Sequence, residues 1–193
     1  MTCSKTDPTS AEIASETLKK GLVAIIPTDT VYGFSGIVDL PGTTGFQTER
    51  KIREIKGRSE TKPFIQLISS PDDILKYSEE RIPEKIKKLW PGPLTVIVKV
   101  KSGITTAFRC PGDEWLRKVI EQCGCPIYST SVNRSGCPVL SSISDIYREF
   151  SDKVDLIVDA GDCQSSVPST IVKIEDGLPV VVRKGAVEID TTA

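Results

Sequence analysis

The sequence contains no histidine among its 193 residues. This absence excludes Ser-His-Asp and Cys-His nucleophilic sites, and it excludes imidazole as a proton carrier near neutral pH. Most catalytic zinc sites also need histidine ligands. An enzyme with this composition must therefore work mainly by positioning its substrates and by stabilising charge.

Long apolar runs and a strong net charge are also missing. The first apolar run, residues 22–26, is too short to span a bilayer, and the polar residues 1–8 do not resemble a signal peptide. We therefore expect a cytoplasmic protein that makes no membrane contact. The formal net charge is -1, which gives no global field that favours nucleic acid, so any anion site must be local.

Cysteine is present, but nothing indicates a secreted protein in which disulfides would form. We expect the six thiols to be free. Cys123 and Cys125 have one residue between them, which is closer than the usual spacing of zinc ligands. No metal site is predicted.

The chain length suits a single domain with one sizeable core over residues 1–193. A capping-box spacing at Thr9 and Glu12 predicts a first helix that ends at Gly21. Further helices are expected near residues 44–55, 83–89, 114–122 and 143–150, and residues 70–73 are expected to open another short helix. Strands or extended segments are expected at residues 22–26, 31–38, 64–68, 94–100, 126–129, 156–159, 170–174 and 179–183. Residues 175–177 join the last two strands as a hairpin, which predicts a mixed sheet.

The two commonest nucleotide-binding loops, GxxxxGK[ST] and GxGxxG, are absent. Four other segments gather polar groups beside strand ends. In the first, Thr28 and Thr30 flank a carboxylate directly after a buried strand. This turn either holds a small polar ligand or is an ordinary connection.

The other three segments are cationic or rich in hydrogen-bond donors. Lys56 and Arg58 flank Gly57 at the end of an expected helix, where they either bind a polyphosphate or pair with the helix dipole. Residues 129–136 form either an anion nest or a polar surface loop. Residues 168–170 with Arg183 form either a phosphate contact or a surface salt bridge.

The order of these segments resembles the YrdC family over about residues 10–190. The matching motifs are residues 27–33 (PTDTVYG), 56–58 with 62–63 (KGR and KP), 89–95 (LWPGPLT), Arg109 with Pro111, 131–136 (SVN and SG), 169–170 (ST), and Arg183 with Gly185. Five positions depart from the family pattern. Ser59 and Lys184 replace frequent prolines, and Pro168 replaces a frequent glutamate. Lys62 stands where many relatives have asparagine, and Leu67 stands where some have histidine.

The resemblance implies a twisted mixed α/β sheet with flanking helices and a concave central cavity. It implies a short-form synthase that makes threonylcarbamoyl-AMP from L-threonine, bicarbonate and ATP, with Mg²⁺ sharing the phosphate charge. A separate tRNA threonylcarbamoyl transferase would use the product to modify tRNA. Because the chain lacks overall positive charge, we expect bare RNA to bind weakly and in a salt-sensitive manner.

The same resemblance implies two groups of site residues. The ATP side comprises Lys56, Arg58, Thr105, Ser131, Asn133 and Arg183, with Lys56 and Arg58 also expected to be catalytic. The side that holds threonine and the carbamate comprises Thr28, Thr30, Arg109, Ser129 and Ser169.

Two alternatives remain open from the sequence. The first is a double-stranded-RNA-binding relative without synthase activity, although the net charge and only 11 aromatic residues (5 Phe, 4 Tyr and 2 Trp) speak against it. The second is a carbamoyl-transfer domain of hydrogenase maturation, which normally belongs to a much longer chain with zinc-finger and acylphosphatase regions.

Overall fold

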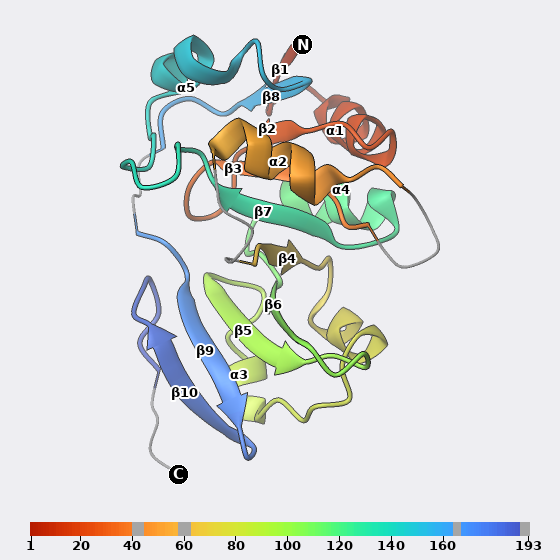
Figure 1. Cartoon of the computed structure of the whole chain (residues 1–193), viewed down its shortest axis with the longest axis vertical. Coiled ribbons are helices and arrows are strands. Elements are labelled where there is room, and N and C mark those ends of the chain that lie inside the picture. The colour runs from red at the N-terminus through yellow and green to blue at the C-terminus, as the bar shows by residue number, and fades with distance from the viewer. Residues whose placement is uncertain (40–44, 58–62, 164–166, 190–193) are drawn as a thin grey trace.

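A ten-stranded mixed sheet runs through the molecule from one end to the other (Figure 1). The computed structural model describes residues 1–39, 45–57, 63–163 and 167–189. In their order across the sheet, the strands are β1 (Thr2–Ser4), β8 (Leu156–Asp159), β2 (Ala24–Ile26), β3 (Gly33–Ile37), β7 (Ile127–Ser131), β4 (Ile65–Leu67), β6 (Thr105–Arg109), β5 (Leu94–Lys99), β9 (Thr170–Glu175) and β10 (Leu178–Arg183).

Helices cover the half of the sheet that contains β1, β8, β2, β3 and β7 (Figure 1). The helices on this half are α1 (Ser10–Lys19), α2 (Thr48–Lys56), α4 (Glu114–Cys123) and α5 (Ile143–Phe150). The 3₁₀ helix η1 (Pro71–Lys76) and α3 (Glu84–Lys87) belong to the other half. Within the described ranges, no helix is long and apolar enough to cross a membrane.

Both faces of this half are buried, because successive residues along a strand pack into the two different cores on either side of the sheet. Leu156 and Val158 of β8 pack with α1 and α4, whereas Ile157 between them packs with α2 and α5. A strand buried on both faces reads as a continuous apolar run, which is why residues 22–26 and 156–159 stand out in the sequence. A third core lies under the other half, where η1 and α3 cover β5, β6 and β9.

The predicted mixed α/β architecture is confirmed, and so is the closing hairpin. β9 and β10 pair antiparallel, and the two residues between them, Asp176 and Gly177, both have left-handed φ angles of 50° and 78°. Positive φ at both positions is the requirement of a two-residue type I′ turn, which the Asp-Gly sequence satisfies.

Two strands were not predicted. β1 has three residues and pairs parallel with β8 at the sheet edge. β6 begins at Thr105 and is only half buried until Phe108, so its sequence shows no apolar run. Non-local pairing with β4 and β5, rather than intrinsic pattern, determines that β6 is a strand.

The predicted capping box of the first helix is wrong, although the helix itself is confirmed. Thr9 occupies the cap position, but its hydroxyl makes no capping bond to the helix. Instead it donates to Asp7 Oδ1 at 2.8 Å, and the Thr9 amide donates to the same oxygen at 2.9 Å. The Asp7 carboxylate therefore competes successfully for the hydroxyl that the spacing assigned to the helix.

Candidate functional site

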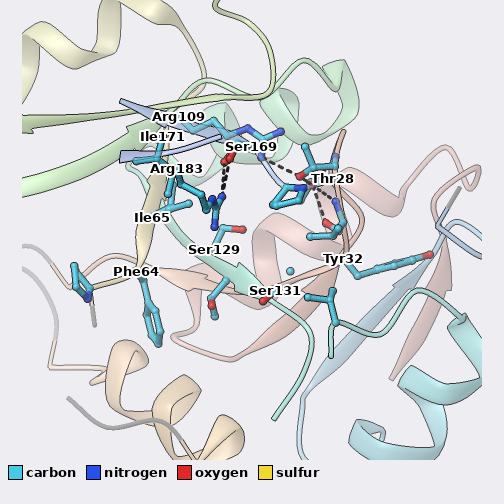
Figure 2. Close-up of a pocket in the computed structure, with 17 residues that line it drawn as sticks. Thr28, Tyr32, Phe64, Ile65, Arg109, Ser129, Ser131, Ser169, Ile171 and Arg183 are labelled. Atoms are coloured by element: carbon cyan, nitrogen blue, oxygen red, sulfur yellow. Dashed lines mark hydrogen bonds between the residues drawn. The ribbon is translucent and has the colours of Figure 1, made fainter. Parts of the chain in front are cut away.

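A cavity of about 310 Å³ lies between the two halves of the sheet (Figure 2). Its described lining comes from the ends of strands and from the turns after them. The lining residues are Thr28, Thr30, Val31, Tyr32, Gly33, Pro63, Phe64, Ile65, Arg109, Ser129, Thr130, Ser131, Val139, Pro168, Ser169, Ile171 and Arg183. Most of its polar groups are hydroxyls, and its two ionisable cations are arginines.

The turn after β2 is folded around a single hydroxyl. Thr28 Oγ1 donates to the carbonyl of Val31 at 2.7 Å and accepts from the amides of Thr30 and Val31 at 3.1 and 3.2 Å. It also lies 3.0 Å from Thr30 Oγ1. This local hydrogen bonding is typical of a Thr-containing turn, and it holds both threonines at the cavity wall.

Arg109 ends β6 and is 5% exposed. Its guanidinium donates to Asp29 Oδ1 at 2.5 Å, to Thr30 Oγ1 at 3.0 Å and to the carbonyl of Gly92 at 3.2 Å. Three acceptors from two segments therefore fix the orientation of this cation. Asp29 itself does not line the main cavity but lines a second cavity of about 250 Å³ behind the same turn.

Arg183 ends β10 and faces the same cavity, close to Ser169 (Figure 2). Its guanidinium donates to the Ser169 carbonyl at 2.7 Å, and the Ser169 hydroxyl shares a 2.8 Å hydrogen bond with Thr95 Oγ1. Burial of the guanidinium and, secondly, the positive charge of Arg109 lower the pKa of Arg183. Its described hydrogen-bond partners are neutral, so its charge is not offset locally.

Lys56 lies beneath the turn that follows β7 and is 3% exposed. Its ammonium donates to the carbonyl of Ser131, to the carbonyl of Asn133 at 2.9 Å and to Asn133 Oδ1 at 3.0 Å. The Asn133 amide also donates to the carbonyls of Arg134 and Cys137 at 2.9 and 2.7 Å. These bonds hold the turn in one conformation and leave Ser131 at the cavity.

The electrostatics of the cavity favour an anion. Among its described lining residues there are two arginines and no carboxylate. The carboxylate of Asp29 pairs with Arg109 and offsets one of the two positive charges. Guanidinium groups and hydroxyls together suit the oxygens of carboxylates and phosphates.

The structure brings together seven of the eleven residues that the resemblance assigned to the site. Those that line the cavity are Thr28, Thr30, Arg109, Ser129, Ser131, Ser169 and Arg183. Lys56 and Asn133 lie behind the wall. Thr105 is exposed at the opposite end of β6 from Arg109 and is outside the lining. Arg58 and Lys62 lie outside the described residues.

Sequence reasoning missed the apolar part of the lining and the role of Asp29. Ile65 pairs directly with Ser129 in the sheet, and Ile171 lies opposite Arg183. Both contacts depend on strands that are distant in sequence, so no local pattern identifies them. Leu67, where some relatives have histidine, is 2% exposed and packs in the core with α1 and α4.

Comparison with known proteins identifies the family of this chain. Residues 16–185 match the Sua5/YciO/YrdC domain, whose family description is telomere recombination. The chain belongs to the Sua5/YciO/YrdC family. The match contains every strand described above except β1, and all the described cavity residues.

Several Sua5/YciO/YrdC relatives have names that state an activity. A Methanocaldococcus jannaschii protein, provisionally named threonylcarbamoyl-AMP synthase, is 32% identical over 191 residues, which cover 94% of this chain and 88% of the relative. A Bacillus subtilis threonylcarbamoyl-AMP synthase is 31% identical and is matched by 95% of this chain. The chain spans only 55% of the Bacillus subtilis protein.

A solved structure has the same fold as this chain. Pyrococcus abyssi Sua5, solved as a complex with L-threonine, superimposes on this chain with a TM-score of 0.79 at 30% identity. The superposition covers 91% of this chain and 54% of that one.

Proposed function

We propose that this chain is an L-threonylcarbamoyladenylate synthase, a nucleotidyltransferase that forms threonylcarbamoyl-AMP and pyrophosphate from L-threonine, bicarbonate and ATP. The observation that supports it is a cavity lined by two arginines and many hydroxyls, in a chain whose relatives have the names of such synthases. ATP, bicarbonate and the carboxylate of L-threonine all present anionic oxygens, which such a cavity suits.

The reaction needs no protein nucleophile, which agrees with the absence of histidine. The threonine amine adds to bicarbonate, water leaves, and a carbamate forms. A carbamate oxygen then attacks the α-phosphorus of ATP, and the bond to pyrophosphate breaks. The protein has to hold two anions together and stabilise the negative charge that develops on the phosphate, so positioning and fixed cations supply the catalysis.

The threonine and carbamate side of the proposed site comprises Thr28, Thr30, Arg109, Ser129 and Ser169. Support for this group comes from their common presence in the cavity lining. Arg109 is the proposed partner of a carboxyl group, because its guanidinium is fixed and buried. The apolar side chain of Ile65 lines the same cavity and is available for the threonine methyl group.

The ATP side of the proposed site comprises Lys56, Arg58, Thr105, Ser131, Asn133 and Arg183. Support comes from Ser131 and Arg183, which line the cavity, and from Lys56 and Asn133, which hold the turn that presents Ser131. Lys56 thus contributes first by organising this turn. Mg²⁺ would arrive with ATP and share the charge of its phosphates.

The proposed product is a mixed anhydride that a separate tRNA threonylcarbamoyl transferase would consume in the cytoplasm. Bare RNA should bind this chain weakly and lose affinity steeply with salt. A tight, salt-resistant complex with duplex RNA would instead favour an RNA-binding protein.

The deciding experiment is an incubation with ATP, Mg²⁺, bicarbonate and labelled L-threonine, with the adenylate measured by mass spectrometry and pyrophosphate by a coupled assay. L-serine is the control, because loss of one methyl group from a fitted pocket costs about 10–200-fold in specificity. Equal turnover of serine and threonine would contradict a threonine-fitted pocket. A folded protein that turns over neither would contradict the proposed function.

A further inference from the structure

Asp29 joins two parts of the sheet that are not neighbours. It lies in the turn after β2, whereas Arg109 ends β6, and three strands, β3, β7 and β4, separate β2 from β6 in the sheet. Even so, Asp29 Oδ1 lies 2.5 Å from the guanidinium of Arg109, and Oδ2 accepts from the amide of Gly112 at 2.8 Å. One carboxylate therefore ties the β2 turn to the segment after β6, on either side of the cavity.

The pair is shielded from solvent, which makes it stronger than an ordinary surface ion pair. The side chains of Arg109 and Asp29 are 6% and 17% exposed. A buried charge pair loses little to ionic screening, and removal of one partner leaves the other charge unpaired.

Arg109 retains donors for a substrate even though it is held firmly. A guanidinium has five N–H groups. Three are used by Asp29, Thr30 and Gly92, so two remain (5 − 3 = 2) on a side chain that lines the cavity. The direction of these two N–H groups depends on the three acceptors that fix the guanidinium. Asp29 supplies the only charged acceptor of the three.

We propose that Asp29 is a positioning residue for Arg109: it holds the guanidinium so that its two remaining N–H groups meet the carboxyl group of the amino-acid substrate. Asp29 also sets the charge of the cavity wall, because it offsets one of the two arginines. The inference rests on the proposed function for the identity of the substrate. The geometry of the pair does not depend on it.

The position of Asp29 separates its effect on the two substrates. Its side-chain partners among the described residues are Arg109, on the proposed threonine side, and the amide of Gly112, and neither belongs to the proposed ATP side. Asp29→Asn should therefore raise KM for L-threonine by about 10–100-fold, the range expected when a buried charged group loses its partner. KM for ATP should change by less than about threefold. A merely structural role would raise both KM values together.

A matched control is Asp113→Asn. Asp113 is also a part-buried carboxylate in an ion pair, with Lys5, but it caps α4 and does not line the main cavity. Asparagine preserves the cap, so this variant should leave both KM values unchanged. Asp29→Glu, which keeps the charge, should recover part of the threonine affinity and serves if Asp29→Asn does not fold.

The closing experiment is a double-mutant cycle on KM for L-threonine, with Asp29→Asn, Arg109→Ala and both together. If Asp29 acts through Arg109, Asp29→Asn should add less than about threefold in the Arg109→Ala background. Additive effects would overturn the inference.

Binding of inorganic pyrophosphate, measured by calorimetry, gives a readout that needs no synthase activity. The Asp29→Asn variant should bind pyrophosphate at least as tightly as wild type does, because the substitution removes a negative charge near the cavity. Weaker binding with an unchanged melt would also overturn it, whereas a wild type that binds pyrophosphate but makes no adenylate would contradict only the proposed function.

Discussion

The guanidinium of Arg183 donates to the backbone carbonyl of Ser169 at 2.7 Å and lies 3.4 Å from its hydroxyl. This contact joins the end of the edge strand β10 to the segment that enters β9. It also places the positive charge of Arg183 beside that of Arg109, which lowers the pKa of Arg183 in addition to the larger effect of burial. Two positive charges held close together favour the binding of an anion between them.

Arg183→Ala should therefore lose activity without losing stability. The residue as a whole is exposed although its guanidinium is partly buried, and its described hydrogen-bond partners are neutral, so the free energy of unfolding should change by about 0.5 kcal/mol or less. Under the proposed assignment of Arg183 to the ATP side, loss of one fixed donor to the phosphate should lower the rate of adenylate formation about 10²–10³-fold. Arg183→Lys should recover part of this rate, because lysine keeps the charge but not the planar pair of donors. Arg148→Ala, which removes an exposed arginine from α5, is the control and should change neither quantity.

Gly185 is required by a close backbone contact next to Arg183. A Cβ placed on Gly185 would lie 2.4 Å from the carbonyl oxygen of Pro168 and 2.5 Å from the backbone carbon of Ser169. These are backbone atoms that cannot rotate away, so Gly185→Ala should displace Ser169 and destabilise the fold by about 1–3 kcal/mol. Thermal melts and adenylate rates should both fall. Gly45→Ala makes the same chemical change in open space and should melt like wild type.

Much of the candidate site could be predicted because its residues follow strands that local pattern reveals. Residues 22–26 are an apolar run and residues 126–129 a predicted strand, and polar residues at or just beyond their ends, including Thr28 and Ser131, line the cavity. Ligand sites in α/β sheets form beside the ends of strands, so polar residues at these strand ends are expected to gather in one site.

What the sequence did not reveal depends on contacts between distant segments. Asp29 meets Arg109 only because the sheet brings the ends of β2 and β6 together, and no spacing encodes that contact. The burial of Lys56 did have a local signal. Lys56 follows Ile52 by four residues in α2, and Ile52 is fully buried, so the two share one face of the helix.

The cysteines should differ sharply in reactivity. Burial raises the pKa of Cys110 and of Cys123 to about 12. At pH 8 only about 10⁻⁴ of each is then thiolate, the form that reacts. Iodoacetamide should therefore modify exposed Cys137 first, while Cys110 and Cys123 stay unmodified until urea unfolds the chain and all six react. Rapid native-state labelling of Cys110 would contradict its burial.

The same two thiols predict a loss of stability at high pH. Their protons are held more tightly in the folded chain than in the unfolded chain, whose thiols have a pKa near 9. The stabilisation is fully present below pH 9 and is lost as the pH rises from about 9 towards 12. The melting temperature should fall over this range. Substitution of both cysteines by alanine should flatten that part of the profile.

Arg58 follows a segment that the structure anchors beside the cavity, although Arg58 itself lies outside the described residues. The carbonyl of Lys56 accepts from the amide of Ser135 at 2.9 Å, and Pro63, five residues after Arg58, lines the cavity. The family resemblance assigns Arg58 to the ATP side, so we expect Arg58→Ala to lower the rate of adenylate formation about 10²–10³-fold with an unchanged melt. Arg50→Ala, from an exposed ion pair on α2, is the matched control and should keep its activity. An Arg58→Ala variant that keeps the wild-type rate would show that the phosphate assignment is wrong, and one that unfolds would show that Arg58 is structural.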